Sequence, residues 1–136
     1  MPPIASYPSL VLHLHRGRTN ALETEWLSFV SSAAFRSQIT DALELARRHN
    51  VTGWIANDRL LGAVRPVDLR WVAEVVLPAM AKLGVQRFAR LESEETLNRM
   101  LIGNMYQDVT EAVPFEVRSF GDLAEARAWA CGLTST

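Results

Sequence analysis

The stretch VTGWIANDRLLGAVRPVDLRW, residues 51–71, decides the fold. Its first part, VTGWIAND, is a short apolar run without polar alternation, which is typical of a central strand covered on both faces. The run ends abruptly in Asn57, Asp58 and Arg59, and a loop then leads to a helix that is expected to open at Asp68. A buried strand followed by a helix is the repeating unit of α/β domains.

Two strands are predicted upstream of this unit. LVLHLHR, residues 10–16, alternates leucines on one face with a second face that carries Val11, His13 and His15. A turn with a glycine and an asparagine follows. The next run alternates less cleanly, but one face holds Leu22, Thr24 and Trp26. The two runs predict an N-terminal hairpin.

Helical apolar spacing appears in four segments. Their N-caps are assigned to Ser32, Asp68, Ser93 and Asp122. The second helix is expected to end at Gly84 and contains Pro78. Pro78 cannot donate a hydrogen bond to the Glu74 carbonyl, so a kink is predicted there.

Two further strands, at 85–92 and 114–120, alternate with these helices. The order β-β-α-β-α-β-α-β-α predicts an α/β fold with a single mixed, largely parallel sheet of about five strands, an N-terminal hairpin and four helices. Residues 1–8 contain three prolines and are expected to be flexible. The predicted domain is therefore 9–133.

Composition excludes several classes of protein. The 136 residues are 49% hydrophobic and 21% charged, which fits one packed domain. The net charge is −1 without a Lys/Arg cluster, so no nucleic-acid partner is predicted. A single cysteine, Cys131, rules out a disulfide within the chain and fits a reducing cytosol. The N-terminus lacks signal-peptide character and no apolar run could span a bilayer, so a cytoplasmic location is expected.

The order and spacing of several segments resemble a known family. The segments are Trp26, AFR at 34–36, WIANDR at 54–59, DLRWVAEVVLPAMAKLGVQRFARL at 68–91 and FGDLAEARAWACGL at 120–133. Together they cover about residues 9–133 and resemble the SpoIIAA-like family of the STAS and CRAL-TRIO-like fold group, particularly its small stand-alone, mostly uncharacterised bacterial members. The resemblance implies a sheet of about five strands with helices on its faces. The STAS side of the group implies protein partners, and the CRAL-TRIO side implies a lipid-like ligand.

The STAS resemblance also implies a phosphorylation switch. In anti-sigma-factor antagonists a phosphorylatable Ser follows the strand equivalent to 52–57, at the start of a helix, where added charge acts on the helix terminus. This sequence has no Ser or Thr between Asn57 and Asp68. A phosphorylation switch is therefore not predicted.

Asp58 and Arg59 form an acid–base pair at a strand end, which is a favoured ligand position in α/β folds. No histidine lies nearby in sequence, and GAVRP has one glycine and is no phosphate loop. The favoured interpretation is structural: Asn57 or Asp58 caps loop N–H groups and Arg59 pairs with a carboxylate. Ligand contact ranks second and catalysis third.

His13 and His15 have the spacing of metal ligands on one strand face, and a third ligand would come from Glu23 or Glu25. The favoured interpretation is a pair of part-exposed polar residues on the outer side of the hairpin, with no metal. Cys131 is interpreted as a small buried residue and not as a nucleophile.

The sequence predicts a non-enzymatic STAS-like binding or regulatory domain that contacts a protein partner or a second copy of itself. The alternative is a small apolar, lipid-like ligand, and an enzyme using Asp58 and Arg59 ranks last. No cofactor is predicted. Trp71 is expected to flank the loop before the helix and to line a cleft or an interface. The candidate contact residues are Asn57, Asp58, Arg59, Asp68 and Trp71.

Overall fold

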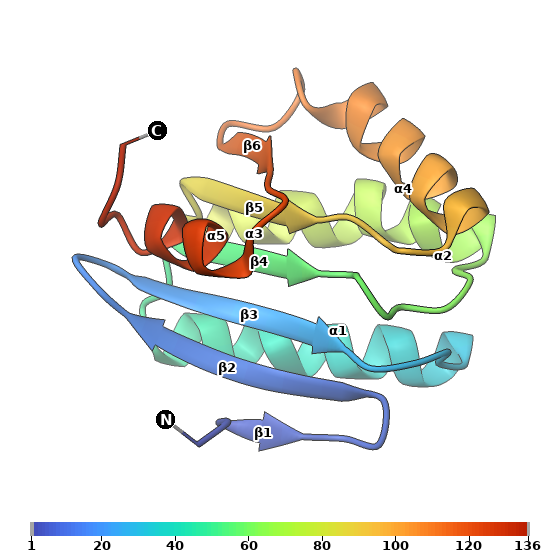
Figure 1. Ribbon diagram of the computed structural model, residues 1–136, viewed down its shortest axis with the longest axis horizontal. Coiled ribbons are helices and arrows are strands. Elements are labelled where there is room, and N and C mark those ends of the chain that lie inside the picture. The colour runs from blue at the N-terminus through green and yellow to red at the C-terminus, as the bar shows by residue number, and fades with distance from the viewer. Residues whose placement is uncertain (1, 136) are drawn as a thin grey trace.

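The computed structural model describes residues 2–135 as one mixed sheet with helices on both faces (Figure 1). The six strands lie in sequence order: β1 (Ala5–Ser6), β2 (Leu10–Arg16), β3 (Asn20–Trp26), β4 (Gly53–Asn57), β5 (Arg87–Leu91) and β6 (Glu116–Ser119). β1, β2 and β3 pair antiparallel, and β3 to β6 pair parallel. The predicted mixed, largely parallel sheet with an opening hairpin is confirmed.

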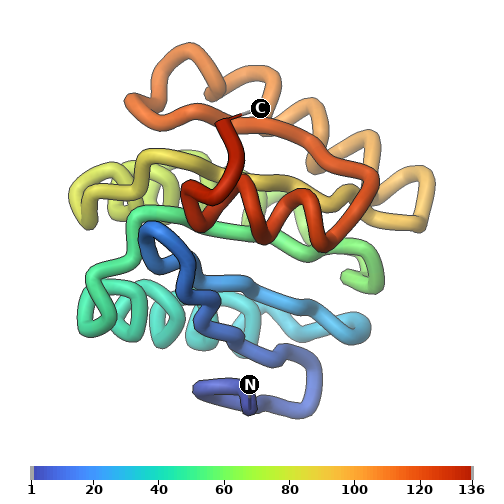
Figure 2. The backbone as a smooth tube through the Cα atoms, turned by 60° about the vertical axis from the view of Figure 1, so that its left-hand side comes forward, coloured from blue at the N-terminus to red at the C-terminus, as the bar shows by residue number. Residues whose placement is uncertain are grey.

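The helices divide unequally between the two faces (Figures 1 and 2). One face is covered by α1 (Ser32–Arg48), α2 (Pro66–Trp71), the π-helical turn η1 (Val72–Val76), α3 (Leu77–Leu83) and α4 (Thr96–Val109). The other face carries α5 (Leu123–Ala130), which contacts β3, β4 and β5. The outer side of β2 is therefore left open beside α5.

Two apolar clusters follow from this division. The larger fills the space between the sheet and α1 to α4 and includes Leu12, Trp26, Trp54 and Phe88. The smaller lies under α5, where Ile55 and Ala89 meet Trp129. Here α5 approaches the sheet so closely that a Cβ on Gly53 would lie 2.1 Å from the Ala130 carbonyl oxygen. Only glycine fits at that point of β4.

Some predicted boundaries were wrong. The sheet has six strands and not about five, because Ala5–Ser6, in the segment expected to be flexible, pairs with β2. The first helix is capped by Ser31, which frees the neighbouring Ser32 for another contact. The helix expected to open at Asp68 begins at Pro66, a residue whose fixed φ suits a first turn. Glu95, and not Ser93, caps α4.

Other boundaries are confirmed. Asp122 caps α5 by accepting a hydrogen bond from the Glu125 amide, and Gly84 ends α3 with a φ of 95°. Close to the predicted kink, the helix becomes the π turn η1 just before Pro78. None of the helices in the described part of the chain combines the length and apolar character that crossing a bilayer requires.

Candidate functional site

The residues that follow β4 separate onto the two faces of the sheet, because successive side chains of a strand alternate. Asp58 continues the row of Trp54 and Ala56 and faces the helices. Asn57 points to the opposite face, where its Nδ2 donates to Glu23 Oε2 at 3.0 Å and its Oδ1 accepts from Arg59 Nε at 3.1 Å. The Asp58 and Arg59 side chains therefore do not pair with each other, and Arg59, which is expected to pair with a carboxylate, instead contacts the Asn57 amide.

Asp58 lines an internal cavity of about 50 Å³ between the sheet and the helices. The lining is almost entirely apolar and includes Trp26, Phe35, Val64, Met80, Phe88 and Ile102. Asp58 is only 9% exposed, and its carboxyl group has no hydrogen-bond partner among residues 2–135. Burial raises its pKa to about 7, although the charge of Arg90 opposes the rise.

Tyr106 lies beside Asp58 on the cavity wall. Burial raises the pKa of its phenol, and the nearby Asp58 charge adds to the rise. The Arg90 guanidinium stacks over the tyrosine ring, 4.4 Å from its centroid. A carboxyl and a hydroxyl therefore reach the same apolar space, which is the composition expected of a small-molecule site.

The loop between Asp58 and α2 is fixed by buried Asn98 on α4. The Asn98 Nδ2 donates to the Leu61 and Gly62 carbonyls at 3.0 and 2.9 Å, and its Oδ1 accepts from the Val64 amide at 3.2 Å. On the other side the loop contacts the β3–α1 connection, since a Cβ on Gly62 would lie 2.7 Å from the Phe29 Cα. The entrance to the cavity is thus held in place by residues far away in sequence.

A surface groove of about 510 Å³ lies at this entrance and shares Phe35 and Val64 with the cavity wall. Its polar rim is built around Asp68, which is 2% exposed. Asp68 Oδ2 accepts from Ser32 Oγ at 2.5 Å and Oδ1 from Arg36 Nε at 2.8 Å. Burial would raise the pKa of Asp68, but these hydrogen bonds outweigh burial and lower the pKa. Asp68 therefore ties α2 to α1.

Trp71 packs against the larger core cluster and is partly buried. Its ring meets Phe35 edge-on at 6.2 Å between centroids, and Arg36 lies over it at 5.3 Å. It lines neither the cavity nor the groove described above. Trp71 therefore packs against Phe35, and Phe35 lines both the cavity and the groove.

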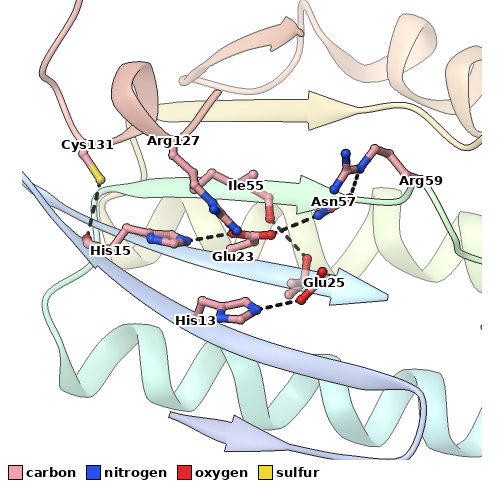
Figure 3. Close-up of polar contacts among 10 residues, drawn as sticks. His13, His15, Glu23, Glu25, Ile55, Asn57, Arg59, Arg127 and Cys131 are labelled. Carbon is pink, nitrogen blue, oxygen red and sulfur yellow. Dashed lines mark hydrogen bonds and ion pairs between the residues drawn. The ribbon is translucent and has the colours of Figure 1, made fainter. Parts of the chain in front are cut away.

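The opposite face holds a polar network centred on Glu23, which is fully buried (Figure 3). Its Oε1 accepts from His15 Nε2 at 2.7 Å and from Arg127 Nε and a terminal nitrogen at 2.8 Å each. Burial alone would raise the pKa of Glu23, but the hydrogen bonds from His15, Arg127 and Asn57 lower it to about 2. Glu23 is therefore a buried, charged carboxylate held by α5, β2 and β4.

His13 forms the second pair on this face, with its Nε2 2.8 Å from Glu25 Oε1. Both groups are partly exposed. Each histidine contacts a different glutamate of β3, the strand that would supply the third ligand in the metal-site alternative drawn from the sequence.

Comparison with known proteins rests on one solved structure. No family model and no curated protein matches the sequence. The chain is similar to a crystal structure of an uncharacterised protein of the DUF3478 family from Shewanella loihica PV-4, described as having a SpoIIAA-like fold. The TM-score is 0.63 at 16% identity, over 93% of this chain and 98% of that one. This chain has a SpoIIAA-like fold.

Within this SpoIIAA-like fold, sequence reasoning missed the residues that complete each site. From the sequence, Glu23 is expected only as a possible metal ligand on the hairpin. Its contact with Arg127, 104 residues away, leaves no local signal in the sequence. Tyr106 and Arg90 are not predicted from the sequence, since Arg90 reaches Asp58 through the pairing of β4 with β5 and Tyr106 reaches it from α4. Strand alternation alone would have separated Asn57 from Asp58.

Proposed function

We propose that this domain binds a small molecule with an apolar body and one hydrogen-bonding group, and that it does so without catalysing a reaction. The observation that supports this most strongly is the Asp58 carboxyl, which faces the apolar cavity and has no hydrogen-bond partner among residues 2–135. A carboxyl held against apolar side chains without a partner lowers stability, so such a group is expected to serve a purpose.

The chemistry of Asp58 indicates which ligand would suit it. With a pKa of about 7 the carboxyl exists in both protonation states near neutral pH, and can either donate or accept a hydrogen bond. A hydroxyl group on the ligand matches both states and is itself uncharged, which suits the apolar wall. Tyr106 adds a second polar contact at the same wall.

The dimensions suggest how the ligand would sit. The cavity of about 50 Å³ is small, whereas the adjoining groove holds about 510 Å³. We infer that the body of the ligand occupies the groove and that its polar end passes between Phe35 and Val64 to reach Asp58. Movement of these two side chains would be sufficient to join the two spaces.

The test uses straight-chain primary alcohols from butanol to decanol, titrated into the purified protein and followed by calorimetry. Affinity should rise with chain length, because each buried methylene contributes about 0.8 kcal/mol. Asp58→Ala should weaken binding of every alcohol by a similar factor, and Val64→Phe should block longer chains. Asp108→Ala, on the exposed side of α4, is the matched control. The proposal is wrong if no alcohol binds, or if Asp58→Ala and Val64→Phe bind as well as the wild type.

A protein partner is the second candidate, and exposed apolar side chains at the same end support it. Phe29 is 66% exposed, Leu60 54% and Val67 48%, on the two loops and the first turn of α2. Phe29 lines the groove, and exposed apolar side chains of this kind are typical of an interaction surface. Light scattering of the wild type and of Phe29→Ser tests self-association: a dimer that the substitution dissociates favours this candidate over the small ligand.

A further inference from the structure

Four side chains meet on the sheet face that carries α5, at the side of that helix toward β2 (Figure 3). His13 and His15 occupy alternate positions of β2, and Glu23 and Glu25 occupy alternate positions of the antiparallel partner β3. The cluster lies on the opposite face of the sheet from the Asp58 cavity. An inference about it is therefore independent of the proposed function.

Three of these side chains bring possible metal-ligand atoms close together. One ligand atom each from His13, Glu23 and Glu25 lies within 4.8 Å of the other two. Metal–ligand bonds of about 2.0–2.2 Å place neighbouring ligand atoms roughly 3–4 Å apart, so small rotations of these side chains would be sufficient. The closest pair, His13 Nε2 and Glu25 Oε1, is joined by a hydrogen bond of 2.8 Å, so the two atoms would move slightly apart to admit an ion between them.

The charges favour a cation. Among residues 2–135, the polar partner of Glu25 is His13, and no arginine pairs with this carboxylate. The positive charge of Arg127 balances the negative charge of Glu23. The negative charge of Glu25 is left for a bound cation to balance. A divalent ion would take the place of the hydrogen bond between His13 and Glu25.

Glu23 keeps a free position despite its many contacts. The contacts from His15 and Arg127 all go to Oε1, whereas Oε2 accepts one hydrogen bond, from Asn57. A carboxylate oxygen has two lone pairs, so Oε2 retains one. Asn57, His15 and Arg127 therefore act as positioning residues that orient the carboxylate, as outer hydrogen-bond partners do in metal sites.

We propose that His13, Glu23 and Glu25 bind one divalent transition-metal ion of the Zn²⁺ type. An imidazole together with carboxylates suits zinc and its neighbours, whereas Mg²⁺ and Ca²⁺ prefer oxygen ligands alone. A hollow of about 830 Å³ lies beside the cluster and is lined by His13, His15, Arg127 and Cys131 among others. Water or an exogenous ligand could complete the coordination from this hollow, as in zinc sites with an open position.

Calorimetric titration of the tag-free protein with ZnCl₂ tests the proposal. One ion should bind per chain, and MgCl₂ should give no heat. His13→Asn and Glu25→Gln should each weaken Zn²⁺ binding by more than about 100-fold, and Asn57→Ala by roughly 10–100-fold, the usual effect of losing an outer partner. His13 and Glu25 are partly exposed, so these variants should fold, which the far-UV circular dichroism spectrum verifies.

Two controls separate this site from other zinc ligands of the chain. His49→Asn, at the C-cap of α1, and Cys131→Ser should bind Zn²⁺ with wild-type affinity. With Co²⁺ as a probe, the absorption spectrum should lack a thiolate charge-transfer band. Absence of Zn²⁺ binding, binding that survives both His13→Asn and Glu25→Gln, or binding that is lost in Cys131→Ser would each overturn the proposal.

Discussion

Asn57 and Asp58 are neighbours in the chain, but their side chains serve opposite faces of the sheet. The Asn57 amide donates to buried Glu23 at 3.0 Å on the face that carries α5. The Asp58 carboxyl lines the apolar cavity between the sheet and the helices of the other face. The two candidate sites therefore share a strand end and no side chain. A substitution at one site should leave the ligand affinity of the other unchanged.

Asp58 should make stability fall as the pH rises from about 4 to about 7. The unfolded chain loses the Asp58 proton at a pKa of about 4, whereas the folded protein keeps it up to a pKa of about 7. The folded state therefore binds more protons than the unfolded chain in this pH window. The free energy of unfolding should fall by at most about 4 kcal/mol across the window. Above pH 7 the loss should be complete.

Urea unfolding of the wild type and Asp58→Asn at several pH values between 4.5 and 8 measures this effect. The amide keeps the shape of the carboxyl and cannot ionise, so the stability of the variant relative to the wild type should increase with pH. Taking the difference at each pH cancels the other titrating groups. Parallel stability curves for the two proteins would contradict a raised pKa for Asp58.

Asn98→Ala should release the loop between Asp58 and α2. The substitution removes two donors and one acceptor for buried loop groups, with an expected loss of about 2–3 kcal/mol. Hydrogen exchange of the Val64 amide should accelerate more than global unfolding explains. Asn104→Ala, exposed on the same helix, should change neither quantity.

Gly53→Ala and Gly103→Ala should have opposite effects. A Cβ on Gly53 would overlap the Ala130 carbonyl oxygen at 2.1 Å, so α5 must move away and we expect a loss of about 3 kcal/mol. A Cβ on Gly103 meets nothing within 4 Å in α4, so alanine there should stabilise by about 0.5–1 kcal/mol. Thermal unfolding of both variants checks the signs, and an unchanged Tm for Gly53→Ala would contradict the close approach of α5.

Asp68→Asn should destabilise the fold and only indirectly affect ligand binding. The amide loses the ion pair to Arg36, and we expect a loss of about 1–2 kcal/mol because Arg36 itself is partly exposed. The matched control is Asp41→Asn, which removes the charge of an exposed acceptor for Tyr7 and should cost less than about 0.5 kcal/mol. Equal losses in the two variants would show that the ion pair between α1 and α2 stabilises the fold no more than the exposed contact of Asp41 with Tyr7 does.

Local signals in the sequence were sufficient for the fold and less so for the sites. Alternation in β2 and the step from strand to helix after Asn57 predict the order of strands and helices along the chain, because periodicity reports which face is buried. The order of the strands within the sheet comes from the family resemblance and not from periodicity. The short strand β1 could not be predicted, since its two residues are held by pairing with Leu12 and Val11 and not by any pattern of their own. The N-caps expected at Ser32 and Ser93 lie instead at Ser31 and Glu95, because several side chains near each helix start can accept a hydrogen bond from its first amides.

The sites depend on contacts between distant segments. Asp58 and Arg59 are adjacent in the chain, but the cavity that Asp58 lines exists because Phe35 on α1, Val64 in the loop before α2 and Tyr106 on α4 meet there. The burial of Glu23 likewise requires Arg127 from the last helix. No pattern within a single segment contains that information.

The π turn at Val72–Val76 has a geometric consequence for the helix that contains it. The core residues of this helix include Val72, Val76 and Met80, each four positions after the last. Four residues exceed one α turn of 3.6 residues and fall short of the wider π turn, whose hydrogen bonds join residues five apart. One α step and one π step of four residues therefore turn the row in opposite directions, so Met80 returns close to the azimuth of Val72. Deleting one residue from η1 would convert it to an ordinary α turn, and the seven positions then separating Val72 from Met80 are close to two α turns, so Met80 would still face the sheet.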